Sequence, residues 1–181
     1  GESFKVPYEI AERREGSRER QGFTTADAIY LLMPDRFANG DTTNDSTDDT
    51  ADKCAREEFY GRHGGDLQGM IDHLDYIADL GMTAIWSTPL LLDNEPFASY
   101  HGYACADYYH IDPRMGSNEL YREYVAEAHK RDIKIIMDIV TNHCGIAHWW
   151  IEDLPFEDWI HRFDNDEYVQ TNNMFSTNMD P

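Results

Sequence analysis

Asp138 and His143 are two side chains able to exchange protons and hydrogen bonds with a ligand, and both follow a largely apolar run. That run, residues 133–137, leads directly into Asp138. Burying an unpaired carboxylate is costly, so Asp138 must be paired or exposed. A binding site at the end of a strand would explain both side chains. A structural aspartate that pairs with an arginine in the core explains Asp138 equally well.

Tyrosine, histidine and aspartate are concentrated in residues 99–103 and 107–113. A tyrosine ring offers a flat apolar face on which a sugar ring can stack, and neighbouring His and Asp side chains supply hydrogen bonds to hydroxyl groups. His101 and Tyr103 are the candidates in the first segment. For each single tyrosine, packing against the core is the alternative explanation.

A third group consists of oxygen-bearing side chains in a loop rich in Asn, Asp and Gly. The loop covers residues 37–45 and is joined by residues 64–66. Calcium takes about six to eight oxygen ligands from carboxylates and carbonyls, and a flexible loop of this composition can wrap around one ion. The spacing is not that of an EF-hand. Because Asn, Asp and Gly are also the commonest turn residues, a solvated loop is the alternative.

Short apolar runs that alternate with helical patterns indicate the elements that position these groups. The predicted strands are residues 28–33, 83–87 and 133–140. Such nearly all-apolar runs are expected of strands buried on both faces, and Pro34 stops the first of them. Apolar residues recur with helical spacing from Asp66 to Gly81, and again after Ser117, which can cap the second helix.

The order of strand, helix and strand predicts an α/β fold with a parallel sheet and right-handed crossovers. All three polar groups then follow the carboxyl end of a predicted strand, where parallel-sheet proteins place their sites. Periodicity alone does not choose between a barrel and a doubly wound sheet. Three strands cannot close a barrel, and 181 residues fall short of the roughly 250 typical of one, so a barrel would have to extend beyond these strands.

The charge balance argues against several classes of partner. Asp and Glu number 35 against 15 Lys and Arg, which gives a formal net charge of −20. A surface this acidic repels phosphate backbones and anionic lipids, so we expect no nucleic-acid partner. No stretch approaches the roughly 20 apolar residues of a membrane span, so we expect no membrane insertion. The 3 cysteines lie far apart and indicate neither a disulfide framework nor a zinc site.

Together these segments resemble glycoside hydrolase family 13, the α-amylase family. Residues 138–143 look like its first signature region after barrel strand three, Tyr103 matches a tyrosine on the loop after strand two, and residues 34–37 match the exit of strand one. The oxygen-rich loop is similar to the calcium loop of the neopullulanase and cyclomaltodextrinase subgroup. The resemblance covers about residues 25–150 and implies strands one to three of a TIM (β/α)8 barrel.

The resemblance also implies a division of the chain. Residues 1–24 would be a linker or arm, consistent with a preceding β-sandwich domain, residues 25–143 the first part of the catalytic barrel, and residues 144–181 the start of the inserted B domain. The subgroup's dimerisation through its leading domain implies a homodimer for the full-length protein. We expect a periplasmic or extracellular location rather than a cytoplasmic one.

Roles for individual residues follow from the same resemblance. Tyr103 would stack on the sugar at the cleavage subsite, and His143 and His101 would hydrogen-bond its hydroxyls. Asp138 would hold an arginine near the nucleophile, and Asn142 matches a position that binds a second calcium in some members. One structural calcium ion is implied, with these ligands: Asn39, Asp41, Asn44, Asp45, Asp66 and the carbonyl of Gly64.

The implied activity is retaining hydrolysis of α-1,4-glucosidic bonds in starch, maltodextrin, pullulan or cyclodextrins. That reaction needs a nucleophilic carboxylate and a carboxylic acid. The family carries them after strands four and five, so we expect no catalytic residue in this chain, and neither activity nor more than marginal stability for it alone. Transfer or isomerisation by the same fold and a non-catalytic carbohydrate-binding relative are alternatives. A nucleotide-binding doubly wound protein is disfavoured, because no Gly-rich loop follows the first strand.

Overall fold

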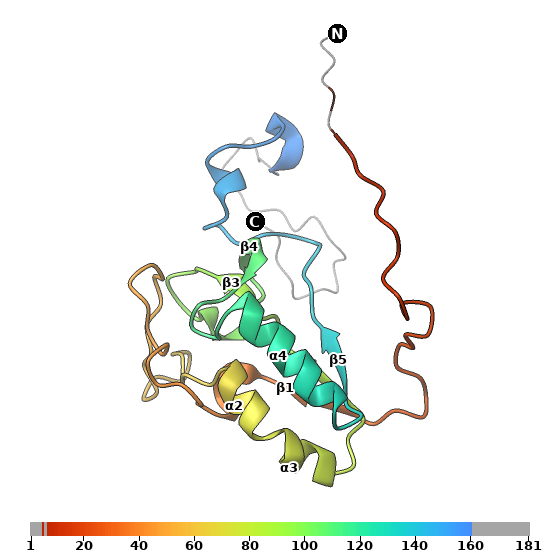
Figure 1. The fold of residues 1–181 in the computed structure, drawn as a ribbon. Helices are drawn as coiled ribbons and strands as arrows, with labels where there is room; N and C mark the ends of the chain where they lie inside the picture. The colour runs from red at the N-terminus through yellow and green to blue at the C-terminus, as the bar shows by residue number, and fades with distance from the viewer. Residues whose placement is uncertain (1–4, 6, 161–181) are drawn as a thin grey trace.

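A parallel sheet of three strands organises the computed structural model, which describes residues 5 and 7–160 (Figure 1). The strands are β1 (Ile29–Leu32), β2 (Ala84–Ser87) and β5 (Lys134–Met137). β2 is central and pairs in parallel with β1 on one side and β5 on the other. This confirms the predicted parallel arrangement, although each strand is shorter than its apolar run because only the paired residues keep ladder geometry. Residues 7–28 form an arm without helix or strand.

The first predicted helix is interrupted. Asp66 caps α2 (Leu67–Asp72) by accepting a hydrogen bond from the Gly69 amide. The chain then leaves helical geometry at His73 and resumes in α3 (Leu74–Asp79). The Nδ1 atom of His73 lies 2.8 Å from the Gly69 carbonyl oxygen, within hydrogen-bonding distance across the break. The prediction of one continuous helix was therefore wrong. Gly81 follows α3 with φ +78°, as expected of a residue that ends a helix.

The second predicted helix is confirmed as α4 (Asn118–His129). Ser117 caps it, because its side chain accepts a hydrogen bond from the Leu120 amide. The helices pack on one face of the sheet and bury its core. Fully buried side chains of this core are Leu67, Met70, Leu74, Ile77, Ile85, Tyr124 and Ala128. No helix in the described ranges is long and apolar enough to cross a membrane.

The other face of the sheet is open, which corrects the expectation of strands buried on both faces. Leu32 is 2% exposed, whereas Leu31, which points the opposite way, is 65% exposed. Ile29 and Trp86 lie on the open face as well. The apolar composition of both faces is typical of strands in a barrel, whose inner face packs against opposite strands, but the residues described here cover only the outer face.

Two further elements were not predicted. The short helix α1 (Pro34–Phe37) follows β1 directly. An antiparallel hairpin of β3 (Leu91–Asp93) and β4 (Cys105–Ile111) rises from the carboxyl end of β2. Its register shifts on both sides of Leu92, so its sequence lacks the clean alternation that marks a hairpin.

Candidate functional site

Asp138 lies at the carboxyl end of β5 and joins side chains from two other elements. Its Oδ2 atom accepts a hydrogen bond from Nε1 of Trp86 on β2, at 3.0 Å, and another from the hydroxyl of Tyr103, at 3.2 Å. Among the described residues Asp138 forms no ion pair with an arginine, so neither the structural pairing nor the arginine expected from the resemblance is seen there. The carboxylate instead fixes the position of Tyr103 over the sheet end.

His143 joins the same group through the backbone. Its Nε2 atom lies 3.1 Å from the carbonyl oxygen of Tyr103, and its own carbonyl oxygen accepts a hydrogen bond from the Tyr108 hydroxyl at 2.8 Å. The Nδ2 atom of Asn142 lies 3.2 Å from Nδ1 of His143. Beside these residues is a cavity of about 500 Å³, whose lining is mostly apolar and includes Trp150. The arrangement can therefore hold an apolar ring face and hydroxyl groups at the same time.

His101 supports Tyr103 from the other side. The Tyr103 amide donates to Nδ1 of His101 at 3.0 Å, and the two ring centroids are 5.8 Å apart. Burial lowers the pKa of His101, although Glu95 opposes the shift, and the Tyr103 amide bond makes Nδ1 the acceptor nitrogen of the ring. Burial also raises the pKa of Tyr103, with a further contribution from Asp138. Tyr103 is therefore a phenol, able to donate its proton to Asp138.

The oxygen-rich loop closes on Asp66, which is fully buried. Its carboxylate accepts hydrogen bonds from the amides of Gly40, at 3.0 Å, and Asp41, at 2.8 Å. It also accepts one from Nδ2 of Asn44 at 3.4 Å. Asp45 accepts a hydrogen bond from Nδ2 of Asn39 at 2.6 Å. Residues far apart in the sequence therefore meet at Asp66, whereas the Asp41 carboxylate accepts hydrogen bonds from the amide and hydroxyl of Thr43 instead.

The donor set fits a hard cation by two observations. The Oδ1 atoms of Asn39 and Asn44 are buried and have no hydrogen-bond partner, which is costly unless something else binds them. Gly64, with φ +83°, lies so close that an added Cβ would meet Oδ1 of Asp45 at 2.5 Å. Within the described residues no three His, Cys, Asp or Glu side chains form a metal cluster. The three aspartates of the predicted set therefore do not gather as a cluster among these residues, and the support for a cation comes from the two amide oxygens.

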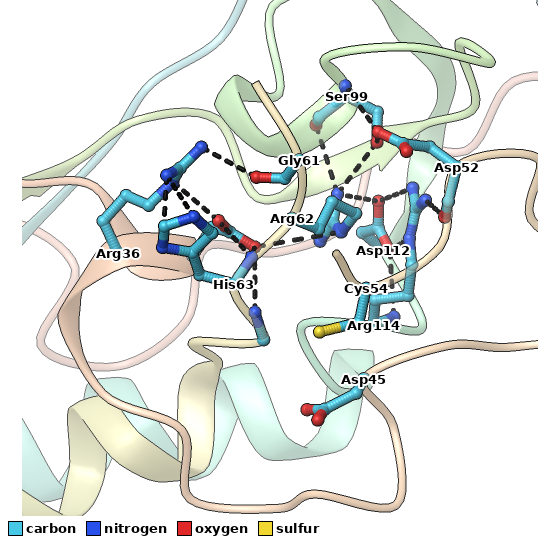
Figure 2. Close-up of polar contacts among 12 residues, drawn as sticks. Arg36, Asp45, Asp52, Cys54, Gly61, Arg62, His63, Ser99, Asp112 and Arg114 are labelled. Atoms are coloured by element: carbon cyan, nitrogen blue, oxygen red, sulfur yellow. Dashed lines mark hydrogen bonds and ion pairs between the residues drawn. The ribbon is translucent and has the colours of Figure 1, made fainter. Parts of the chain in front are cut away.

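A buried charge network between the oxygen-rich loop and the tyrosine segment was missed by the sequence reasoning (Figure 2). Asp35, in α1, is 1% exposed and accepts hydrogen bonds from the amides of His63 and Gly64. Arg36 pairs with Asp35 at 2.9 Å, and its guanidinium lies 4.1 Å from the ring centroid of Tyr100. Charged residues in a loop give no sequence signal of burial, since their pairing depends on the tertiary fold.

Comparison with known proteins shows what this chain is similar to. The family model described as alpha amylase, catalytic domain, matches residues 31–179. The chain is 41% identical over 128 residues to a cyclomaltodextrinase of Thermoanaerobacter pseudethanolicus, which covers 70% of this chain and 21% of that protein. It is 42% identical over 140 residues to neopullulanase 2 of Thermoactinomyces vulgaris, which covers 72% of this chain and 23% of the relative.

Solved structures agree with these relatives. The crystal structure of an Anoxybacillus α-amylase superposes with a TM-score of 0.70 at 40% identity, and the match covers 82% of this chain and 30% of that one. The chain thus spans less than a third of the length of these relatives. The likeness makes the three parallel strands part of the TIM-barrel fold of amylases. The chain therefore belongs to the α-amylase family of glycoside hydrolases, in its neopullulanase and cyclomaltodextrinase-like subgroup.

Proposed function

We propose that the protein containing this chain hydrolyses α-1,4-glucosidic bonds in starch-derived glucans, pullulan or cyclodextrins. The observation that carries the proposal is the hydrogen-bonded group of Tyr103, Asp138 and His143 at the carboxyl ends of parallel strands. This is where barrel enzymes place their active sites. The names of the relatives, cyclomaltodextrinase and neopullulanase, support the substrate class.

In this proposal the chain supplies substrate contacts. The ring of Tyr103, 39% exposed, stacks on a sugar at the cleavage subsite. Asp138 holds the Tyr103 hydroxyl and so sets the angle of the ring. His101 donates to a sugar hydroxyl from Nε2, because its Nδ1 atom accepts from the Tyr103 amide, and His143 hydrogen-bonds a second hydroxyl in exchange for one of its contacts with Tyr103 and Asn142. The nucleophile and the general acid lie outside residues 1–181, after later strands of the barrel.

A calcium ion belongs to the same proposal. Asn39, Asp41, Asn44, Asp45, Asp66 and the Gly64 carbonyl would hold it, supported by the two unpartnered amide oxygens. Bound there, the ion would satisfy the two amide oxygens and stabilise the loop between β1 and α2. Calcium is then structural and takes no part in bond cleavage. Residues 144–181, of which 161–181 lie outside the described residues, are proposed as the start of the inserted domain, and Trp150 lines the cavity beside His143.

The test begins with an intact-mass determination of the native protein, followed by assay of that sample on starch, pullulan and cyclodextrin. A mass well above that of 181 residues, with release of reducing sugar, supports the proposal. An active protein of 181 residues would show that the catalytic carboxylates were wrongly placed outside it. No release from any of the three substrates would refute hydrolysis.

Transfer is the second candidate, because one similar structure, 33% identical with a TM-score of 0.58, is titled a cyclomaltodextrin glucanotransferase. Product analysis in the presence of a glucose acceptor distinguishes the two reactions. Longer glucans indicate transfer, whereas shorter products alone indicate hydrolysis.

A further inference from the structure

Arg62 is a buried arginine whose hydrogen bonds reach a distant segment of the chain. Its side chain is 1% exposed. Its Nη1 atom donates to the carbonyl oxygen and to the hydroxyl of Ser99, each at 3.2 Å. Figure 2 shows the Arg62 guanidinium between Ser99 and Asp112, and the Asp35 carboxylate also lies within 4 Å of it.

The aspartates near Arg62 offset its charge at a distance but do not hydrogen-bond its guanidinium. The closest approaches are 3.9 Å from Nε to Asp35 and 3.8 Å from Nη1 to Asp112, both longer than a hydrogen bond. The Nε atom has no hydrogen-bond partner. Burial lowers the pKa of Arg62, although Asp112 and Asp35 oppose the shift. A buried ion of this kind adds little to stability compared with an apolar residue, so its directional bonds to Ser99 are its distinguishing feature.

Ser99 is the anchor of the segment that carries Tyr103. It begins the short 3-10 helix η1 (Ser99–His101), and both its amide and its hydroxyl donate to Oδ2 of Asp52, at 3.0 and 2.9 Å. The residue before it, Ala98, has φ +59°, a left-handed conformation that a non-glycine residue adopts at a cost of about 1 kcal/mol. A segment that enters through such a conformation needs fixed contacts to hold it, and Arg62 and Asp52 provide them.

Arg62 is also continuous with the calcium loop proposed above. The next two residues, His63 and Gly64, donate their amides to Asp35. Gly64 in turn lies against Asp45 and Asn39. Residues 62–64 therefore connect the loop directly to Ser99. Arg114, the other fully buried arginine of the described chain, contacts Asp112 and the backbones of Asp52 and Asp93 but not Ser99.

We propose that Arg62 is a positioning residue that couples cation binding in loop 39–66 to the order of the substrate-contacting segment 98–103. The inference rests on the proposed calcium and sugar sites. When a divalent cation orders the loop, Gly64 and His63 are fixed against Asp35, and Arg62 is then held in reach of Ser99. When the loop loosens, Ser99 loses its bonds to Arg62 and keeps those to Asp52 and from the Gly102 amide, so the segment that leads into Tyr103 becomes less ordered.

Hydrogen exchange of the full chain, in CaCl2 and in EDTA, tests the coupling. In the unaltered chain calcium should slow exchange both in loop 39–66 and in segment 98–103. In Arg62→Met, calcium should still slow exchange in loop 39–66 but should have no effect on segment 98–103. In calcium, that segment should exchange roughly tenfold faster than in the unaltered chain, and a tenfold change corresponds to about 1.4 kcal/mol. Arg62→Lys should restore part of the response, because an ammonium can still donate to the Ser99 carbonyl.

Three comparisons keep the result interpretable. Arg122→Met removes an exposed arginine of α4, 71% exposed, and should behave like the unaltered chain. Exchange within α4 reports global unfolding and should be the same in all variants. If Arg62→Met fails to fold, Ser99→Ala removes only the hydroxyl contacts and should weaken the response of segment 98–103 by roughly half, since the bond to the carbonyl remains.

The outcomes separate the coupling from the calcium site. The coupling is overturned if calcium slows exchange in segment 98–103 of Arg62→Met, or of Ser99→Ala, as much as it does in the unaltered chain. The calcium site itself would still stand. No calcium response in loop 39–66 of the unaltered chain overturns the calcium site and the coupling with it.

Discussion

Replacing Asp66 tests the claim that this carboxylate organises the loop between β1 and α2. The side chain is fully buried and accepts hydrogen bonds from the amides of Gly40, Asp41 and Gly69. In Asp66→Ala all three amides lose their acceptor, and α2 loses its cap. A bond to a charged acceptor contributes about 1.5–3 kcal/mol, but such contributions do not add fully. We expect the free energy of unfolding to fall by about 4 kcal/mol.

Asp66→Asn refines the test. One carbonyl oxygen remains for Gly40 and Gly69, while the amide nitrogen faces the donors of Asp41 and Asn44. We expect about half of the loss, roughly 2 kcal/mol, because the remaining bonds also lose their ionic character. Asp72→Ala in the same helix is the matched control, since Asp72 is exposed and bonds only the Gln68 side chain, a pair of about 0.5 kcal/mol or less.

Urea unfolding of the intact protein, followed by far-ultraviolet circular dichroism, measures these differences, and EDTA throughout keeps cation binding out of the comparison. The loss in free energy of unfolding should be largest in Asp66→Ala, smaller in Asp66→Asn and smallest in Asp72→Ala, whether or not the loop binds calcium. A loss below about 1 kcal/mol in Asp66→Ala would refute the assigned role, because that is what an ordinary exposed cap contributes.

Three further predictions follow from burial and charge. Burial raises the pKa of Asp93 from 3.8 to about 6, so the folded chain holds this proton more tightly than the unfolded one and stability falls as pH rises between these values. Asp93→Asn lacks this penalty, and urea titrations at pH 4 and pH 7 should show the variant gaining about 2 kcal/mol relative to the unaltered chain between the two pH values, whereas a constant difference would contradict the raised pKa. Leu74→Ala, at a fully buried position, should lower the free energy of unfolding by about 2–5 kcal/mol, and Leu80→Ala, at a 47% exposed position, by less than about 1 kcal/mol. In the intact enzyme, Tyr103→Phe keeps the stacking face but loses the bond to Asp138, so kcat/KM on maltodextrin should fall roughly tenfold. Tyr103→Ala also loses the stacking face, so its kcat/KM should fall about a further tenfold. Equal losses in the two variants would show that stacking does not contribute.

Sequence reasoning succeeded where local physics decides the outcome. The Ser117 cap and the helical spacing after it predicted α4, and the apolar runs predicted the parallel order of β1, β2 and β5. The sequence also predicted that polar groups follow the strand ends. Tyr103, Asp138 and His143 meet there because parallel strands share one carboxyl edge.

It failed where distant contacts decide. No proline or glycine stands at the break at His73, so the sequence does not predict an interruption of the helix there. The hairpin of β3 and β4 is irregular in register, so its sequence shows no alternation. Burial of Arg62 and Arg114 depends on aspartates and carbonyls brought in by other segments, and charged residues are expected at the surface unless such partners are known.

The open face of the sheet and the outer edge of β5 could be used to report the docking of a further strand. Within the described ranges β5 pairs only with β2, so its other edge presents unpaired backbone amides and carbonyls in parallel register. A separately expressed segment of the same barrel, beginning with the next strand, could dock on this edge and cover Leu31 and Trp86. Reassembly would change the environment of Trp86, so the fluorescence of a variant that keeps Trp86 as its single tryptophan would follow complementation. With the activity proposed above, a protein split in this way would report strand docking by fluorescence and by restored catalysis together.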